Sequence, residues 1–169
     1  ALSGGVTATY VPAGHVLGSA QILLEHAGER IVVTGDYKRR ADPTCPQFQV
    51  VPCDIFITEA TFGLPVFRHP DDREEIAKLL KSVAQFPASA HLVGAYALGK
   101  AQRLMRTVDA GIGPLLTVTA VENTNAVLRA QGITLPGTQP ITEDVSAKSH
   151  PGALIIATPG STTQNWARR

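Results

Sequence analysis

The sequence predicts an α/β fold built from two parts that differ in their hydrophobic pattern. Up to about residue 66, short apolar or alternating segments are separated by turn residues, which is typical of β-strands. Beyond that point, apolar runs alternate with segments of helical periodicity, which indicates a parallel sheet covered by helices. We therefore expect residues 1–66 to form part of a mixed β-rich domain and residues 67–169 to form part of a βαβ domain.

The first part is expected to contain four strands. They are predicted over residues 6–11, 20–24, 30–34 and 54–58. In the second of these, Ala20, Ile22 and Leu24 share one face, because side chains alternate along a strand. The continuous apolar run Ile55–Phe56–Ile57 is typical of a strand that is covered on both faces. The loops between these strands hold the candidate ligands.

The second part is expected to alternate helices with strands. Helices are predicted between Pro70 and Pro87 and over residues 100–109 and 121–131, and strands over 91–97, 115–118 and 153–157. The apolar residues of the first helix follow the spacing of one buried face: Ile76, Leu79, Leu80 and Val83. Asp72 and Glu75 resemble a capping box at its start. Residues 133–152, rich in Pro, Thr and Ser, predict a long loop.

Composition narrows the classes of protein to be considered. No apolar run is long enough to cross a bilayer, and the first residues lack the pattern of a signal peptide. The formal charge of +1 gives no general attraction for nucleic acid, so that role requires local clustering of basic residues. Cys45 and Cys53 lack the spacing of a zinc-binding pair. Two lone thiols favour a reducing compartment, and we expect a cytoplasmic protein.

The most informative residues are a histidine and an aspartate in two different loops. His15 lies in the glycine-flanked segment 14–19, and Asp36 follows the predicted strand 30–34. Imidazole nitrogen and carboxylate oxygen are ligands that suit zinc and manganese. We expect both residues to bind divalent metal, which would polarise a phosphate oxygen and generate hydroxide from bound water. The alternatives are an ordinary loop histidine and a common Gly-Asp turn at a strand end.

Three other residues are candidates because of where they stand along the chain. Lys38 and Arg39 follow Asp36 directly and can contact phosphates beside a metal, although a basic run of three is usually a solvated surface. Glu59 follows the predicted strand 54–58, where an acid can orient a histidine or relay a proton. The alternative for Glu59 is a polar loop residue that is hydrogen-bonded to nearby backbone.

Gly99 and Lys100 lie where the predicted strand 91–97 passes into the helix 100–109. Free amides at that helix start can receive a phosphate. A bound anion would also offset the unfavourable position of Lys100 at the positive end of the helix dipole. The alternative is that Gly99 merely allows close packing. This segment also permits a different reading, in which the chain is an unrelated α/β protein that binds a phosphorylated small ligand.

Four motifs occur in order along the chain. They are GHVLGS at 14–19, TGDYKR at 34–39, TEATFG at 58–63 and ALGKAQ at 97–102. In this order they resemble the β-CASP branch of the metallo-β-lactamase nucleases, and the likeness covers essentially the whole chain. Within that branch, the segments 37–39, 42–45 and 62–65 resemble the bacterial ligase-associated DNA exonucleases.

The resemblance implies a partial metallo-β-lactamase (αββα) sheet in residues 1–66 and part of a β-CASP domain with a parallel sheet in residues 67–169. By position, His15 corresponds to the third-motif histidine ligand of the family, and Asp36 to its bridging aspartate. Glu59 corresponds to the acid that pairs with a later histidine. The resemblance further implies a two-metal hydrolysis of phosphodiesters, with zinc or manganese, on nucleic acid that lies between the two domains.

The dense histidine and aspartate cluster of the family, and its later histidines, are not in this sequence. We therefore expect the central fragment of a DNA 3′-end-processing exonuclease that acts in DNA repair alongside an ATP-dependent DNA ligase. The chain alone is expected to bind the catalytic metals poorly and not to cut DNA. An exposed sheet edge predicts a homo-oligomer. The alternatives are an RNA-processing β-CASP ribonuclease and a non-catalytic nucleic-acid-binding module.

Overall fold

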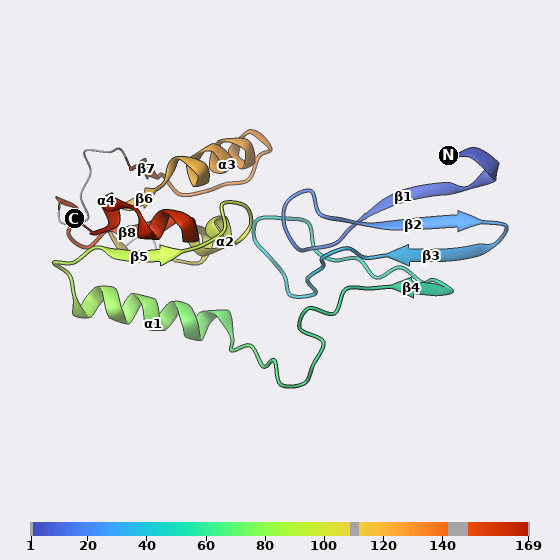
Figure 1. Cartoon of the computed structure of the whole chain (residues 1–169), viewed down its shortest axis with the longest axis horizontal. Helices are drawn as coiled ribbons and strands as arrows, with labels where there is room; N and C mark the ends of the chain where they lie inside the picture. The colour runs from blue at the N-terminus through green and yellow to red at the C-terminus, as the bar shows by residue number, and fades with distance from the viewer. Residues whose placement is uncertain (1, 109–111, 142–148, 169) are drawn as a thin grey trace. The chain divides into compact units, whose positions relative to one another are not determined.

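The computed structural model describes residues 2–108, 112–141 and 149–168. The chain divides into two compact units, Ala1–Arg68 and His69–Arg169. Figure 1 shows a four-stranded sheet in the first unit, and helices and strands together in the second. The α/β class that the sequence predicts is confirmed: one unit has a mixed sheet and the other a parallel one.

The sheet of unit 1 follows the order of the sequence. After a short 3-10 helix, η1 (Ser3–Gly5), its strands are β1 (Thr7–Pro12), β2 (Ala20–His26), β3 (Glu29–Val33) and β4 (Ile55–Ile57). The first three are antiparallel neighbours, and β4 pairs with β3 in parallel. The hairpin between β2 and β3 turns at Ala27 and Gly28, both of which have positive φ. The four strands therefore form where the hydrophobic pattern predicts them.

One face of this sheet is covered in its middle and the other is open. The covered face carries Val11, Leu23 and Val32, which pack with Val51 and Cys53 from the segment that leads into β4. The open face carries two rows of residues that lie directly opposite one another across the strands. These rows are Ala8–Leu24–Ile31–Ile55 and Tyr10–Ile22–Val33–Ile57. Nearly every side chain on the open face is apolar.

The expectation that β4 is covered on both faces is wrong. Ile55, Phe56 and Ile57 are 47%, 50% and 53% exposed: Ile55 and Ile57 lie on the open face, and β4 is an edge strand with a neighbour on one side only. The shared face of Ala20, Ile22 and Leu24 is likewise the open one. On β2 the buried side chains are Gln21 and Leu23.

The described residues of unit 2 form four parallel strands and four helices. The strands are β5 (His91–Gly94), β6 (Leu115–Thr117), β7 (Gln139–Pro140) and β8 (Leu154–Ala157), in the sheet order β5-β8-β6-β7. The helices are α1 (Asp72–Gln85), α2 (Lys100–Thr107), α3 (Thr119–Ala130) and α4 (Asn165–Arg168), with a 3-10 helix, η4 (Pro159–Thr163), before the last. Every residue of the central strand β8 is buried.

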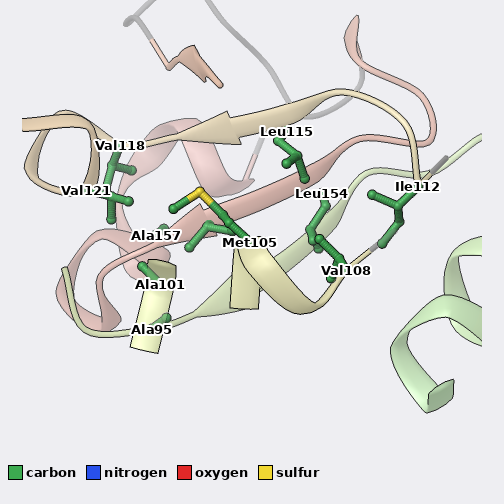
Figure 2. Close-up of a cluster of buried hydrophobic side chains, with 11 residues drawn as sticks. Ala95, Ala101, Met105, Val108, Ile112, Leu115, Val118, Val121, Leu154 and Ala157 are labelled. Atoms are coloured by element: carbon green, nitrogen blue, oxygen red, sulfur yellow. The ribbon is translucent and has the colours of Figure 1, made fainter. Parts of the chain in front are cut away.

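Both faces of the sheet in unit 2 are covered. Leu154 and Ile156 of β8 join a cluster with Ala101 and Met105 of α2, which Figure 2 shows together with residues of α3 and β6. The apolar face of α1, predicted from its spacing, packs against this cluster. Ile155 points the other way and packs with Leu116 and Trp166. A strand buried on both faces explains the continuous apolar run that forms β8.

Some boundaries differ from the predicted ones for local reasons. Helix α1 is capped by Asp71, whose side chain accepts a hydrogen bond from the Arg73 amide, and not by Asp72 as its sequence suggested. The predicted loop 133–152 contains the short strand β7, which pairs with β6. The predicted end of the second helix at residue 109 lies outside the described residues, as does the loop over 142–148. Among the described helices, none is long and apolar enough to span a membrane.

Candidate metal centre

The loop between β1 and β2 presents His15 on a backbone that is held by its neighbours. The hydroxyl of Ser19 accepts hydrogen bonds from the amides of His15 and Val16, at 3.0 and 3.1 Å. The Ala13 amide donates to the Ser19 carbonyl at 3.1 Å and so closes the loop. The side chain of His15 stays exposed. This serine, the last residue of the first motif, therefore fixes the loop from which the imidazole projects.

The segment that follows β3 brings Asp36 to the same place. The Thr34 amide donates to the Ile57 carbonyl at 3.0 Å, which continues the pairing of β3 with β4. The Lys38 amide donates to the Ala13 carbonyl at 3.0 Å and ties this segment to the histidine loop. As a result, His15 Nε2 lies 3.8 Å from Asp36 Oδ2, with the two side chains 45% and 72% exposed. The structure brings together the two residues that the sequence predicted as ligands.

The separation of these two atoms suits a shared ion. Ligand atoms that each lie about 2.0–2.2 Å from a zinc ion can be at most about 4.4 Å apart, and the observed 3.8 Å is within that limit. A zinc site needs three or four ligands, however. Within the described residues, no group of three His, Cys, Asp or Glu side chains is placed to hold a metal. The pair therefore fits part of a metal site, and its further ligands would come from elsewhere.

Glu59 lies near the pair and is held in its ionised form. Its carboxylate accepts a hydrogen bond from the Thr61 amide at 2.6 Å. This hydrogen bond lowers the pKa of Glu59 below its usual value, and the charge of a protonated His15 lowers that pKa further. Glu59 and Asp36 follow β4 and β3, which are parallel neighbours, so the two acids leave the sheet at the same end. An ionised acid here is suited to accept a hydrogen bond or a proton.

Lys38, predicted to contact phosphates, has a partner within its own segment. Its ammonium forms an ion pair with Asp42, whose side chain is almost fully buried. Asp42 also accepts hydrogen bonds from the amide and hydroxyl of Thr44, at 2.9 and 2.5 Å. Burial alone would raise the pKa of Asp42, but the hydrogen bonds from Lys38 and Thr44 outweigh it and lower that pKa. Lys38 therefore stabilises the loop that carries Asp36. Arg39 is exposed.

At the helix start, the amides of Gly99 and Lys100 have hydrogen-bond partners within the chain. The Gly99 amide donates to the Gln102 side chain at 2.8 Å, and the Ala101 amide donates to the Tyr96 carbonyl at 3.2 Å. The Lys100 amide is bonded as well, to the Leu98 carbonyl at 3.2 Å. The amides expected to receive a phosphate are therefore occupied. The Lys100 ammonium lies 4.9 Å from the centre of the Tyr96 ring.

Sequence reasoning missed the residues that support the candidate ligands. The Asp42–Thr44 hydrogen bonds have a recognisable signal, because an Asp two residues before a Thr often binds its backbone in a turn. The pairing of Asp42 with Lys38 has no comparable signal, since the four-residue spacing is meaningful on a helix and this segment is not helical. Gln21 is buried, and its amide donates to the carbonyls of Pro12 and Gln49, at 3.2 and 2.7 Å. Its position in a strand pattern gave no hint of that role.

Comparison with known proteins finds relatives for a part of this chain. Cleavage and polyadenylation specificity factor 73 of Drosophila melanogaster is 37% identical over 100 residues, which are 57% of this chain and 14% of that protein. Endoribonuclease YSH1 of Kluyveromyces lactis is 36% identical over 108 residues, 62% of this chain and 14% of the relative. Endoribonuclease ysh1 of Aspergillus fumigatus is 39% identical over 106 residues, 60% of this chain and 12% of the relative. No family model matches the sequence.

The chain thus spans 12–14% of the length of these curated relatives. Two of the three are named as endoribonucleases, which supports the nuclease part of the resemblance. None of the three names refers to a DNA exonuclease or a ligase. Among solved structures, a protein of unknown function from Enterococcus faecalis V583 matches with a TM-score of 0.61 at 14% identity. That match covers 92% of this chain and 42% of the other, and it concerns the fold alone.

Proposed function

We propose that this chain is part of a metal-dependent nuclease of the β-CASP metallo-β-lactamase type that hydrolyses phosphodiester bonds in RNA. The observation that carries the proposal is the approach of His15 Nε2 to Asp36 Oδ2, 3.8 Å apart and exposed to solvent. These residues come from two of the four ordered motifs. Their meeting, on separate loops of one sheet, supports the roles that the resemblance implies for them.

The chain supplies three groups to this chemistry. His15 and Asp36 offer an imidazole nitrogen and a carboxylate to divalent metal, zinc or manganese, with Asp36 suited to bridge two ions. Bound metal would polarise a phosphate oxygen and make its coordinated water more acidic. Glu59, ionised by its hydrogen bond to Thr61, acts beside them as an acceptor that orients a histidine or relays a proton.

RNA is favoured as the substrate because relatives of this chain are named endoribonucleases. A second candidate is a DNA 3′-end-processing exonuclease that acts in DNA repair with an ATP-dependent DNA ligase. The segments 37–39, 42–45 and 62–65 support this candidate, because they resemble the bacterial ligase-associated enzymes. The two candidates share the metal chemistry and differ in whether the site accepts a 2′-hydroxyl.

The test measures cleavage by the gene product that carries this chain. Single-stranded RNA and DNA of the same sequence are incubated with it, with zinc or manganese and with a chelator. We expect metal-dependent cleavage of RNA, reduced more than ~100-fold by His15→Ala and by Asp36→Ala, since even outer-shell partners of a metal contribute 10–100-fold. His26→Ala is the control, because His26 is also exposed, on β2 of the same unit.

The outcomes separate the candidates. Cleavage of DNA with RNA left intact would favour the exonuclease. Full activity of both ligand variants would overturn the metal role of His15 and Asp36. For the 169 residues alone, we expect weak metal binding in equilibrium dialysis and no cleavage, because the described residues bring only a pair of donors together. Cleavage by the chain alone, free of contaminating nuclease, would contradict that expectation.

A further inference from the structure

The loop that follows Glu59 exposes two aromatic rings. Phe62 and Phe67 are 60% and 46% exposed, and Leu64 and Val66 between them are exposed as well. Contiguous apolar surface of this kind is costly to leave in water and commonly marks a binding site. Nothing in the proposed metal chemistry uses these rings. Their exposure therefore needs an explanation of its own.

The loop is built so that the two rings meet. The Glu59 carboxylate binds the Thr61 amide at 2.6 Å, the Gly63 amide donates to the Ala60 carbonyl at 3.0 Å, and the Phe67 amide donates to the Leu64 carbonyl at 3.1 Å. A Cβ at Gly63 would lie 3.2 Å from the Cβ and carbonyl of Ala60, so the first turn leaves little room for a side chain there.

The outcome of these turns is an aromatic pair with a defined geometry. The ring centres of Phe62 and Phe67 are 5.4 Å apart, and the planes are inclined at 76°. This edge-to-face arrangement is a favoured one for aromatic pairs. It orders the rings before any ligand binds, and a large part of each ring remains accessible. Preorganised aromatic surface binds with less loss of conformational entropy than a mobile loop would.

The position of the pair links it to the candidate metal centre. Phe62 follows Glu59 by three residues, so their Cα atoms are at most about 11 Å apart. Glu59 follows β4 and Asp36 follows β3, and these strands are parallel neighbours, with the Thr34 amide donating to the Ile57 carbonyl at 3.0 Å just before both residues. A strand of nucleic acid with a phosphate at the metal pair would therefore have bases within reach of this loop. Arg68, exposed and next to Phe67, adds a positive charge that can contact a phosphate.

We propose that Phe62 and Phe67 form a stacking platform for an unpaired base of single-stranded nucleic acid beside the His15–Asp36 pair. The inference rests on the proposed function, because it takes the substrate to be nucleic acid. Aromatic side chains hold unpaired bases by stacking, which tolerates any base because every base has a flat face. The platform positions the strand. The same surface would also suit a protein partner, and the experiment distinguishes the two occupants.

The test measures binding by the gene product that carries this chain, without metal, so that no strand is cut. Fluorescence anisotropy gives its affinity for a single-stranded RNA and for the same backbone made abasic. Stacking contributes about 5- to 150-fold in affinity per base, so Phe62→Ala and Phe67→Ala should each weaken binding of the RNA by about that factor. On the abasic strand the variants should bind like the unaltered protein. Phe86→Ala is the matched control, because Phe86 is 57% exposed in unit 2.

A second pair of variants separates stacking from general apolar contact. Phe62→Trp should keep or strengthen the affinity for RNA, and Phe62→Leu should lose it, because leucine keeps the bulk without the aromatic face. Equal binding by Phe62→Ala and the unaltered protein would overturn the platform while leaving the nuclease standing, which is judged by cleavage in the His15 and Asp36 variants. Equal behaviour of the Leu and Trp variants, or no binding of any strand, would also overturn it and leave a protein as the occupant of this surface.

Discussion

Gly14 shows how a single residue joins the two loops of the candidate site. It is buried, with φ of +71°, in the left-handed region that side chains with a Cβ rarely adopt. A Cβ at this position would lie 2.5 Å from the Lys38 carbonyl oxygen and 2.7 Å from the Phe48 amide nitrogen. Both atoms belong to backbone, so neither can move away easily. The close approach of His15 to Asp36 therefore depends on the glycine beside the histidine.

Replacing Gly14 with alanine should destabilise unit 1 beyond the strain of the backbone conformation. Gly18, in the same loop, also has positive φ, but a Cβ there would meet no atom within 4 Å. Gly18→Ala should therefore lower the free energy of unfolding by only about 1–2 kcal/mol, the cost of the left-handed conformation. Gly14→Ala should lower the free energy of unfolding by a further ~1–3 kcal/mol, the usual cost of overpacking a buried site. Urea denaturation followed by circular dichroism measures the difference, and equal losses would show that the contact with Lys38 and Phe48 is not tight.

The candidate site could be predicted from the sequence where a residue carries its own local signal. His15 between glycines and Asp36 after a strand have such signals, and the structure places them together. Lys38 has none, because its partner Asp42 is defined by the fold of the loop and not by the pattern of the sequence. Whether a backbone amide is free to bind a ligand is equally hard to predict from the sequence. At Gly99 it depends on where the side chain of Gln102 points.

At the scale of elements, α3 is tied to its neighbours by one carboxylate. The Glu122 side chain accepts hydrogen bonds from Arg129, Thr117, Asn125 and Thr138 at 2.6–3.1 Å. These donors lie on α3, on β6 and in the segment before β7. Burial alone would raise the pKa of Glu122, but the four hydrogen bonds outweigh it and lower that pKa to about 2. The ionised carboxylate therefore stabilises the folded state of unit 2.

The pH dependence of stability follows from that lowered pKa. In the unfolded chain the carboxyl has a pKa of 4.5, so its contribution is complete above that pH and is lost as the pH falls towards about 2. We expect the stability of unit 2 to decrease over this interval. The free energy of unfolding of the Glu122→Gln variant should fall less as the pH falls. At neutral pH it should be about 1–3 kcal/mol lower than that of the unaltered chain, which is the usual contribution of hydrogen bonds to a charged group.

Trp166, the only tryptophan, packs in unit 2, so its fluorescence during denaturation reports this unit selectively. Glu74→Gln is the control, because Glu74 is an exposed acid in the first turn of α1. If Glu122→Gln kept the full pH dependence of the unaltered chain, other carboxyl groups would have to cause it.

The elements themselves could be predicted well from the sequence, because their signals are local. The spacing of apolar residues that predicts α1 and the unbroken apolar run that predicts β8 each lie within a short stretch of sequence. What covers an element is not local. The runs in β4 and β8 are equally apolar, yet β4 is exposed at a sheet edge and β8 is buried between β5 and β6. Strand order, which separates the two cases, depends on contacts between distant segments.

For the molecule as a whole, the open face of the unit 1 sheet predicts self-association. Its two rows cross all four strands, and Tyr10, Ile55 and Ile57 on it are 78%, 47% and 53% exposed. Monomeric proteins rarely expose an apolar patch larger than a few hundred Å². A second copy of the chain offers an identical face, and pairing of the two faces would remove both from water. We therefore expect the purified chain to form dimers or larger species as its concentration rises.

Sedimentation velocity over a range of concentrations tests this expectation, and β4 offers a matched pair of changes. The double change Ile55→Lys and Ile57→Lys places charge on the open face and should shift the association equilibrium towards the monomer. Phe56→Lys places charge on the same edge strand, at a residue that is 50% exposed but points to the opposite face. It should leave association unchanged if the faces pair. Equal effects of both changes would show instead that the chains associate through the free edge of β4, and a clean monomer at high concentration would contradict self-association altogether.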